Sequence, residues 1–339
     1  MDYKVILLMV LITFIFVSII IPFIMQIAIH VNALDIPDKR KVHNKPMPRL
    51  GGLGIYSGFL FGYMLFCKES LMMNSIFIGS FIIVVTGIID DIKPIRARYK
   101  FLGQVIAACV VSIYGGLLLR DVSAFGIYIN FGIFTYPVTI LFIVGIINCI
   151  NFLDGLDGLA AGICSIYFLT VGILAVMFNN STGLDTILSF ILLGSTLGFL
   201  VHNFNPAKIF MGDSGSMFLG YIISIIALLG YKNITFTSLL VPVFLLAIPI
   251  LDTLFAILRR ILKHQPISSP DKSHFHHQLL KLKFSTKKTV IIIYCVDLLF
   301  ALASIFYVLG DFVFGLIVYS ILLFLIIILI VKTDIIVKK

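Results

Sequence analysis

The sequence predicts an all-α integral membrane protein, built as a polytopic bundle of about eleven transmembrane helices. Composition gives the first reason. Of the 339 residues, 60% are hydrophobic and 12% are charged, whereas soluble domains are roughly half apolar and about a quarter charged. The second reason is that the apolar residues form long runs, close to the ~20 residues that a membrane-spanning helix needs. The third is that Lys and Arg gather in alternate connections between these runs.

The predicted spans follow the apolar runs in chain order. The first run is longer than the apolar core of a cleavable signal peptide, which has about 7–15 residues, so we expect it to remain as a membrane span. The fifth and eighth spans are the least regular, because they are short or rich in small residues. We expect one membrane domain over residues 1–339. The spans are 4–28, 51–67, 73–89, 102–119, 132–149, 159–178, 185–202, 214–231, 236–258, 289–309 and 312–331.

The basic residues predict how the chain is oriented. With the N-terminus outside, 21 of the 25 Lys and Arg residues fall on the cytoplasmic side and 4 fall outside, as the positive-inside rule requires. An odd number of spans then places the C-terminus inside. We therefore expect a multi-pass protein of the cell membrane, with the lipid bilayer and no nucleic acid as a partner. The polar stretches that suggest chemistry all fall on the cytoplasmic side: 35–50, 90–100, 148–158, 202–216 and 259–288.

The stretch NCINFLDGLDGLAAG, residues 148–162, joins two uncharged apolar runs. It contains Asn148, Asn151, Asp154 and Asp157, and each Asp is followed by Gly. If the segment is helical, Asn151, Asp154 and Asp157 share one face, because they repeat every three residues. Carboxylate and amide oxygens are hard ligands that suit Mg²⁺. The alternative is an Asx-rich turn between two helices.

Two further acidic motifs lie at the ends of spans. Asp90 and Asp91 are adjacent, and Lys100 follows nine residues after the second. Carboxylates so close together repel one another, which suits a metal site or a general base. The alternative is a helix end whose charge is balanced by Lys93 and Arg96.

The second of these motifs is HNFNPAKIFMGDSGSMFLG, which begins at residue 202. Here Asp213 and Ser214 stand where a span begins. Either residue is a candidate cap for that helix. Asp213 is also a candidate hard ligand in the same site as the other acids, and Phe210 is a candidate to stack on a base or a sugar.

Two basic loops complete the set of polar motifs. The first carries Lys45 and Arg49 among three prolines and is followed by Gly51 and Gly52. It is either a loop that sets topology or one that binds phosphate, in which case the glycines let the next helix begin against a close neighbour.

The second basic loop carries His274, His276 and His277. A basic, His-rich loop without a nearby Cys favours a pyrophosphate clamp over a zinc site. The alternative without a catalytic role is a basic loop attracted to anionic lipid. Asp252 lies in the preceding span, with Arg259 and Arg260 as candidate partners.

Five motifs in this order resemble those of the polyprenyl-phosphate N-acetylhexosamine-1-phosphate transferases, glycosyltransferase family 4. They are PxPRxGG from Pro46, the Asp pair with its downstream Lys, NxxNFxDGxDGLAxG, NxxPAKxFMGDSGS and HxHH. The resemblance covers nearly the whole chain. It implies an enzyme that transfers a sugar-1-phosphate from a UDP-N-acetylhexosamine to a polyprenyl phosphate at the cytoplasmic face, releases UMP and needs Mg²⁺, with Mn²⁺ as a substitute. Family members often form homodimers.

The form of the last motif favours one branch of the family. The phospho-MurNAc-pentapeptide transferases of peptidoglycan synthesis usually have three consecutive His and ten spans. Here Phe275 separates His274 from His276, and eleven spans are predicted. The chain therefore looks more like the undecaprenyl-phosphate GlcNAc-1-phosphate transferases that start teichoic acid, O-antigen or similar glycopolymers, with the peptidoglycan branch as the alternative.

The resemblance implies a role for each matching position near the reacting phosphates. Asp213 and Asn151 match the Mg²⁺ ligands of the family. Asp90 matches the acid proposed to deprotonate the lipid phosphate, and Asp91 lies beside it. Lys100 matches a lysine near the phosphates.

Other matching positions surround the nucleotide. Asp157, Asn203 and Phe210 match positions around the uridine, and Asp154 lies in the same motif. Two basic loops of the family also have matching residues here. Lys45 and Arg49 belong to the first-loop motif, which meets the incoming phosphates. The loop that closes over the pyrophosphate and sugar matches His274, His276 and His277.

From the residues alone, two hypotheses other than a transferase remain open. An ion-coupled transporter predicts acids near mid-span and repeats with broken helices, whereas the main acids here lie at cytoplasmic ends. A lipid-binding scaffold would not need so many hard ligands. Within the transferase reading, the expected reaction is a single displacement, and its rival is a covalent phosphosugar-aspartyl enzyme.

Overall fold

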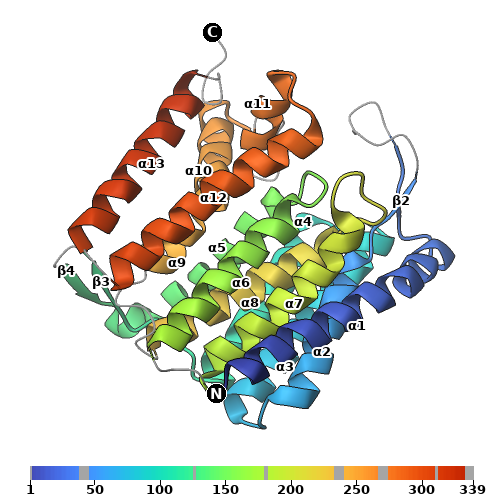
Figure 1. Ribbon diagram of the computed structural model, residues 1–339, viewed down its shortest axis with the longest axis horizontal. Helices are drawn as coiled ribbons and strands as arrows, with labels where there is room; N and C mark the ends of the chain where they lie inside the picture. Colours follow the sequence, from blue (N-terminus) through green and yellow to red (C-terminus); the bar gives the residue numbers. More distant parts are fainter. Residues whose placement is uncertain are drawn as a thin grey trace.

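The computed structural model is a bundle of long α-helices that pack side by side (Figure 1). It describes residues 2–37, 46–124, 127–178, 182–232, 240–265, 274–309 and 312–332. The longer helices are α1 (Tyr3–His30), α2 (Gly51–Phe66), α3 (Leu71–Ile92), α4 (Ala97–Cys109), α5 (Thr135–Leu153), α6 (Leu159–Met177), α7 (Leu184–Asn203), α8 (Gly212–Lys232), α10 (Ala247–Leu262), α12 (Thr286–Leu309) and α13 (Phe312–Lys332). The shorter elements are α9 (Leu240–Leu245), α11 (Phe275–Lys281), a π-helix (Val110–Tyr114), a 3₁₀ helix (Gly132–Phe134) and the strands β1 (Leu34–Asp35), β2 (Met47–Pro48), β3 (Asp121–Ala124) and β4 (Ile127–Asn130).

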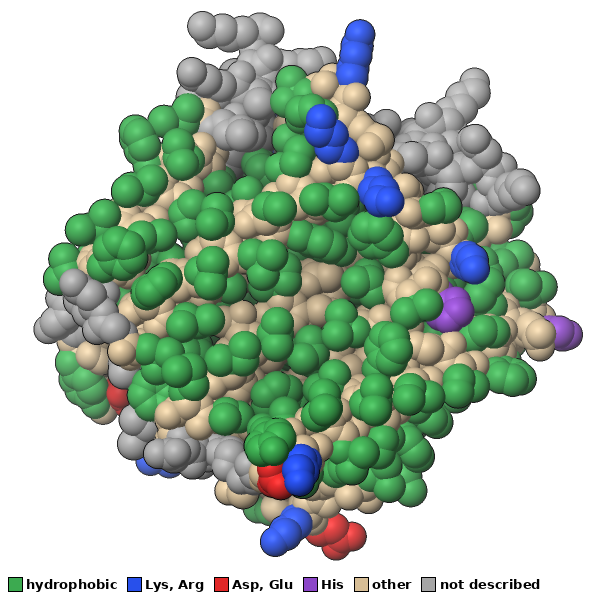
Figure 2. All heavy atoms as spheres, in the orientation of Figure 1, with side chains coloured by type: hydrophobic (Ala, Val, Ile, Leu, Met, Phe, Trp, Pro, Cys, Tyr) green, Lys and Arg blue, Asp and Glu red, His purple; other side chains and the backbone are tan. Residues whose placement is uncertain are grey.

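This architecture confirms the predicted all-α polytopic fold. Within the described residues, seven helical segments are long and apolar enough to cross a membrane, and α2 and residues 313–328 are shorter apolar helices. Large apolar side chains of α1 such as Leu7, Ile19 and Phe23 are exposed. Figure 2 shows one broad face covered mainly by apolar side chains, with Lys and Arg toward the ends of the bundle. A face of this kind suits contact with lipid.

Two of the eleven predicted spans are interrupted, so the expected count is not matched by eleven continuous helices. The fourth is α4 followed by the π-helix, and it ends at Tyr114, before the two glycines at 115 and 116. The ninth is divided into α9 and α10. Pro249 explains that division, because it has no N–H for the carbonyl of Leu245 and its ring clashes with that carbonyl.

The most deeply buried of the candidate spans is α8, of which 94% is buried. It packs against α2, α3, α5 and α7. A Cβ atom on Gly52 would lie 2.0 Å from the backbone nitrogen of Gly215, and one on Gly87 would lie 2.3 Å from Ser214 Cα. The expected close approach of Gly52 to a neighbour is therefore confirmed, and the neighbour is the first turn of α8.

The predicted chemical motifs lie at one end of the bundle. The β1–β2 hairpin and α11 lie at this end, and the β3–β4 hairpin lies at the opposite end (Figure 1). In β1–β2, Leu34 pairs with Pro48 and Asp35 with Met47. The Phe210 N–H donates to the Pro48 carbonyl at 2.8 Å. The first loop is therefore joined to the segment that leads into α8, far along the chain.

Candidate active site

The buried carboxylate of Asp91 caps the beginning of α8. It lies in the last turn of α3 and accepts hydrogen bonds from the backbone N–H groups of Asp213 (2.9 Å) and Ser214 (3.0 Å) and from the Ser214 hydroxyl (2.7 Å). The first N–H groups of a helix have no partner within the helix and favour a negative charge. The expectation that Asp213 or Ser214 caps this helix was therefore wrong, because the cap comes from another helix.

Lys100 lies between the two other carboxylates of this cluster. Its Nζ atom is 2.7 Å from Asp90 Oδ2 and in direct contact with Asp213 Oδ2. The second oxygen of Asp90 accepts the N–H of Ile95 at 2.9 Å. The turn between α3 and α4 thus brings Asp90 and Lys100 together, and both meet the start of α8.

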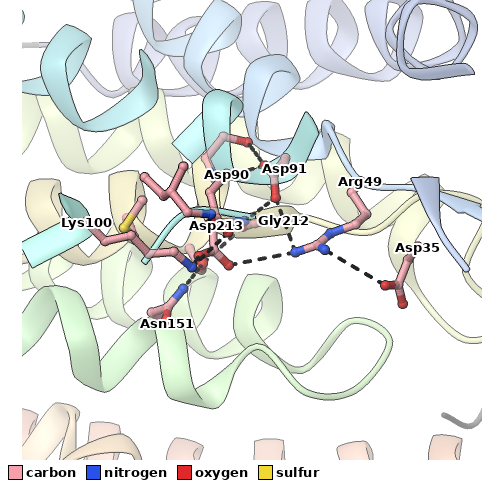
Figure 3. A network of polar contacts seen from close by, with 12 residues as sticks. Asp35, Arg49, Asp90, Asp91, Lys100, Asn151, Gly212 and Asp213 are labelled. Atoms are coloured by element: carbon pink, nitrogen blue, oxygen red, sulfur yellow. Dashed lines mark hydrogen bonds and ion pairs between the residues drawn. The ribbon is translucent and has the colours of Figure 1, made fainter. Parts of the chain in front are cut away.

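Arg49 approaches the carboxylates of Asp91 and Asp213 from the side opposite to Lys100 (Figure 3). Its guanidinium lies 3.4 Å from Asp91 Oδ1, 4.0 Å from Asp213 Oδ1 and 3.9 Å from Asp35 Oδ1. The β1–β2 hairpin positions this side chain, because the Arg49 N–H donates to the Ala33 carbonyl at 3.0 Å. Arg49 was predicted from its motif, whereas Asp35 was not singled out.

The three carboxylates fit a hard divalent cation. Ligand oxygens of Asp90, Asp91 and Asp213 lie within 4.8 Å of one another. The three carboxylates here face two cationic side chains, Lys100 and Arg49. The negative charge of the cluster is therefore not fully balanced by these two side chains, and a bound cation would complete the balance. Oxygen-only donor sets of this kind suit Mg²⁺ or Mn²⁺ rather than a soft metal.

Asn151 lies beside this cluster, on the last turn of α5 (Figure 3). Its amide nitrogen donates to the Ser216 hydroxyl at 2.8 Å, so its carbonyl oxygen is the atom with ligand chemistry to offer. One turn earlier, Asn148 donates to Gln104 Oε1 at 2.8 Å. Asn148 therefore joins α5 to α4, while Asn151 joins α5 to α8.

The segment after Leu153 is a turn, so the condition for a shared helical face of Asn151, Asp154 and Asp157 is not met. Helix α5 ends at Leu153, and α6 begins only after Gly158, whose φ is 78°. A left-handed conformation of this kind favours glycine. The Asx-rich turn, which the sequence left open, is what the structure shows.

The turn is held by the segment between α7 and α8. Asp157 Oδ2 accepts hydrogen bonds from Asn205 Nδ2 (2.9 Å) and the Ala207 N–H (3.1 Å). Asn203 Oδ1 accepts the N–H of Gly158 at 3.0 Å, and its amide donates to the Ile209 carbonyl at 2.8 Å. Asp157 and Asn203 thus fix two loops to one another as well as facing the pocket.

A pocket of about 590 Å³ lies over these loops. It reaches from the carboxylate cluster to the first loop on one side and to the His-rich segment on the other. Its size falls within the range of small-molecule sites. The lining residues include Arg49, Asp154, Asp157, Asn203, Phe210, Asp213 and His277, together with Asp35, Asn205 and Thr286.

The three histidines lie at one side of the pocket. His277 lines it, and the His276 and His277 ring centroids are 4.3 Å apart. Among the described residues, the buried Nε2 atom of His276 has no hydrogen-bond partner. It lies against Gly155, where a Cβ atom would be 2.7 Å from it. His274 is buried and donates from Nδ1 to Asp252 at 2.8 Å.

Asp154, which lines the pocket, and His276, which lies against the pocket residue Gly155, have strongly altered acidity. Burial, followed by the nearby carboxylates of Asp213 and Asp91, raises the pKa of Asp154 to about 7. Burial, followed by the neighbouring His277, lowers the pKa of His276 to about 3. Asp154 therefore changes its charge near neutral pH, whereas His276 is a neutral ring there.

The structure brings together nearly all of the candidate residues predicted from the sequence. Asp90, Asp91, Lys100 and Asp213 form the polar cluster, with Asn151 at its edge. The other candidates line or flank the pocket, and Lys45 lies outside the described residues. Three supporting residues were not singled out as parts of the site: Asp35, Asn205 and Tyr294, whose hydroxyl donates to the Gly158 carbonyl. Asp35 begins the polar stretch 35–50, and Asn205 belongs to the motif that contains Asn203, whereas Tyr294 lies in an apolar run and had no signal of this kind.

Sequence comparison relates the chain to known proteins. A sequence model of glycosyl transferase family 4 matches residues 73–231. The probable undecaprenyl-phosphate N-acetylglucosaminyl 1-phosphate transferase of Bacillus subtilis (strain 168) is 44% identical over 292 residues, which are 85% of this chain and 81% of that protein. The decaprenyl-phosphate N-acetylglucosaminephosphotransferase of Mycolicibacterium smegmatis is 32% identical over 298 residues, 79% of this chain and 73% of that protein. The undecaprenyl-phosphate alpha-N-acetylglucosaminyl 1-phosphate transferase of Salmonella typhi is 27% identical over 289 residues, 83% and 78% of the two chains.

Proposed function

Because this chain belongs to glycosyl transferase family 4, we propose that it transfers GlcNAc-1-phosphate from UDP-GlcNAc to undecaprenyl phosphate. The products are UMP and a lipid-pyrophosphate-linked sugar that starts a cell-envelope glycopolymer. The names of the similar proteins support the polyprenyl phosphate acceptor and the GlcNAc group. One structural observation supports this function above all others. Lys100 links Asp90 to Asp213 beside a pocket, at one end of an apolar helix bundle.

The bound Mg²⁺ proposed here would be held by Asp213 and Asn151, with Asp90 and Asp91 in the same cluster. It would supply positive charge to the phosphate oxygens of the donor. Asp91 has a second task, because its carboxylate accepts the first N–H groups of α8 and so fixes Asp213. Mn²⁺ has the same preference for oxygen ligands and is expected to substitute.

The pocket residues have chemistry that suits a UDP-sugar. Phe210 offers an aromatic face for the uracil, and Asp157 and Asn203 hold the adjoining loops in place. Arg49 and His277 line the same pocket and present N–H groups to the pyrophosphate. Lys45, in the first loop, is proposed to assist them.

The acceptor phosphate would attack the β-phosphorus of the donor in a single displacement. Asp90 would take the proton of the lipid phosphate, and Lys100 would stabilise the charge that develops on the departing UMP. The rival mechanism forms a covalent phosphosugar on an aspartate first. It predicts UMP release in the absence of the lipid acceptor.

The membrane arrangement follows from the basic residues. We propose that the N-terminus lies outside and that the C-terminus and the site are cytoplasmic, because 21 of the 25 Lys and Arg residues are then inside. This orientation exposes the pocket to cytoplasmic UDP-sugar and keeps it within reach of a lipid phosphate. A homodimer is also expected from the family.

The first test is UMP release by the purified full-length protein with Mg²⁺ and undecaprenyl phosphate. UDP-GlcNAc, UDP-GalNAc and UDP-MurNAc-pentapeptide are compared as donors. We expect UMP with UDP-GlcNAc, its loss in Asp213→Ala, and normal release in Asp121→Asn, which changes a carboxylate at the opposite end of the bundle. Release with the pentapeptide donor alone would assign the chain to the peptidoglycan branch. No release with any donor would reject the transferase function and favour a transporter or scaffold.

A further inference from the structure

Asp252 lies outside the pocket lining but makes close contacts with the His-rich segment. It belongs to α10 and is buried, with a relative exposure of 6%. Its Oδ2 atom accepts a hydrogen bond from His274 Nδ1 at 2.8 Å, and its Oδ1 atom accepts the N–H of Phe275 at 2.8 Å. Both oxygens of this carboxylate therefore bind consecutive residues of one segment.

These two hydrogen bonds fix the start of α11. His274 is the residue before the helix, and its own side chain makes no capping hydrogen bond to α11. The Asp252 carboxylate accepts the first N–H of the helix instead. Because α11 has only seven residues, its orientation depends strongly on contacts of this kind with the rest of the fold.

The position of His274 is transmitted to the other two histidines by packing. The His274 and His276 rings are nearly parallel, with an interplanar angle of 1° and centroids 5.7 Å apart. His276 lies against Gly155, and His277 lines the pocket. A shift of His274 would therefore move the rings that form this wall of the pocket.

The same contact determines which nitrogen of His274 carries a proton. An ionised carboxylate only accepts hydrogen bonds, so the proton of a neutral His274 lies on Nδ1 and its Nε2 atom has a free lone pair. Carboxylates that orient a metal-ligating histidine in this way cost about 10–100-fold in affinity or activity when lost, and we take the same scale for a histidine that acts on a pyrophosphate.

We propose that Asp252 is a positioning residue for the transfer reaction, acting through His274. It holds His274 in the Nδ1–H form and fixes α11 so that His276 packs against Gly155 and His277 faces the pocket. This inference rests on the proposed function, since the histidines must act on the sugar pyrophosphate for their position to matter. Asp252 itself is not expected to contact the substrate.

The matched variants are Asp252→Asn, Asp252→Glu and Asp297→Asn. Asp297 is a second buried aspartate, on α12, and its Oδ1 atom has no hydrogen-bond partner in the part of the chain that the structure describes. Asp297→Asn thus removes a buried carboxylate without touching the His-rich segment. The double variant Asp252→Asn with His274→Gln tests whether the two residues act as one unit.

Two measurements on the full-length protein are made. ¹⁵N NMR of histidine-labelled protein reports the protonated ring nitrogen, with the His274 signal assigned from its absence in His274→Gln. Steady-state UMP release gives kcat and KM. We expect Asp252→Asn to lose the Nδ1–H signal of His274 and to lower kcat about 10–100-fold. Asp252→Glu should recover part of kcat, and Asp297→Asn should resemble the wild type in both measurements.

The double variant separates positioning from general destabilisation. If Asp252 acts through His274, the double variant should be no slower than His274→Gln alone. The proposal would be overturned if the fall in kcat of the double variant equalled the product of the falls in the two single variants. An unchanged His274 signal in Asp252→Asn would also overturn it. If the wild type releases no UMP, the transferase function fails, and the NMR result still shows whether Asp252 controls the state of His274.

Discussion

Asp91 and Asp213 belong to different helices and are joined through the backbone, with Asp91 Oδ1 accepting the N–H of Asp213 at 2.9 Å. The same carboxylate also accepts both the N–H and the hydroxyl of Ser214. One residue of the adjacent acidic pair thus builds the helix end that presents Asp213, and the other, Asp90, contacts Lys100. The two acids have different partners despite being neighbours in sequence.

The first prediction concerns the cap on α8. Asp91→Ala should lower the free energy of unfolding by about 1–3 kcal/mol, because it leaves buried N–H groups without an acceptor. UMP release should also fall, because Asp213 loses its fixed position. Thermal denaturation and UMP release are measured in the same detergent. Ser214→Ala is the control, since it removes one hydrogen bond and keeps the Asp91 contacts to the backbone. Equal stability of Asp91→Ala and wild type would contradict the cap.

The second prediction concerns Lys100, which contacts both Asp90 and Asp213. Lys100→Met removes the charge that stabilises the departing phosphate, so kcat should fall by about 10²–10³-fold. Lys93→Met serves as the control, because Lys93 is exposed and lies just after α3. A kcat for Lys100→Met similar to that of the control would exclude a role for Lys100 in transfer.

The third prediction uses the pKa of Asp154, which is raised to about 7. Without divalent cations, UDP-GlcNAc should bind more weakly as the pH rises from 6 to 8, because Asp154 becomes negative in the pocket wall. The stability of the fold should also fall as the pH rises. The native state holds the Asp154 proton at pH values where the unfolded chain has lost it, so the contribution of this group to stability decreases from about pH 4 to about pH 7. Calorimetric titration with UDP-GlcNAc over the first of these ranges, pH 6 to pH 8, measures the binding. Asp154→Asn should flatten the pH dependence, and an unchanged slope in that variant would assign it to another group.

The fourth prediction uses His276, whose pKa is lowered to about 3. The unfolded chain binds this proton near pH 6.5, whereas the folded protein excludes it until about pH 3. The stability that His276 contributes is therefore present above about pH 6.5 and is lost as the pH falls toward 3. Thermal denaturation from pH 7 to pH 4 should show a smaller loss in His276→Gln than in wild type. Asp154→Asn serves as a second comparison, because the raised pKa of Asp154 acts with the opposite sign.

Much of the fold could be predicted because apolar composition and span length report directly on burial in lipid. The helix ends were harder to predict. Asn151, Asp154 and Asp157 have helical spacing, yet the chain turns after Leu153, since the glycines at 155 and 158 permit a turn there. Short-range spacing does not reveal which of two allowed local structures the rest of the fold selects.

The site was predictable as a set of residues but not as a set of contacts. Hard ligands and cations in five loops indicated the chemistry, because few structural roles require so many of them at one membrane face. The partner of Asp91 is 122 residues away, and that of Asp252 is 22 residues away. Such pairs depend on how helices pack, which periodicity along a single chain does not report.

The last prediction concerns Tyr294, whose hydroxyl donates to the carbonyl of Gly158. Its ring also fills the space beside Gly162, where a Cβ atom would lie 2.0 Å from the Tyr294 hydroxyl. This contact holds the end of the Asp154–Asp157 turn against α12. Tyr294→Phe keeps the ring and removes only the hydrogen bond, so stability should fall by about 0.5–1.5 kcal/mol.

If the turn forms part of the donor site, Tyr294→Phe should also raise the KM for UDP-GlcNAc more than it changes kcat. Steady-state kinetics with varied donor measures both constants. Tyr136→Phe, at an exposed position on α5, is the matched control and should change neither. A normal KM in Tyr294→Phe, together with lower stability, would show that this hydrogen bond supports the fold but does not set the shape of the donor pocket.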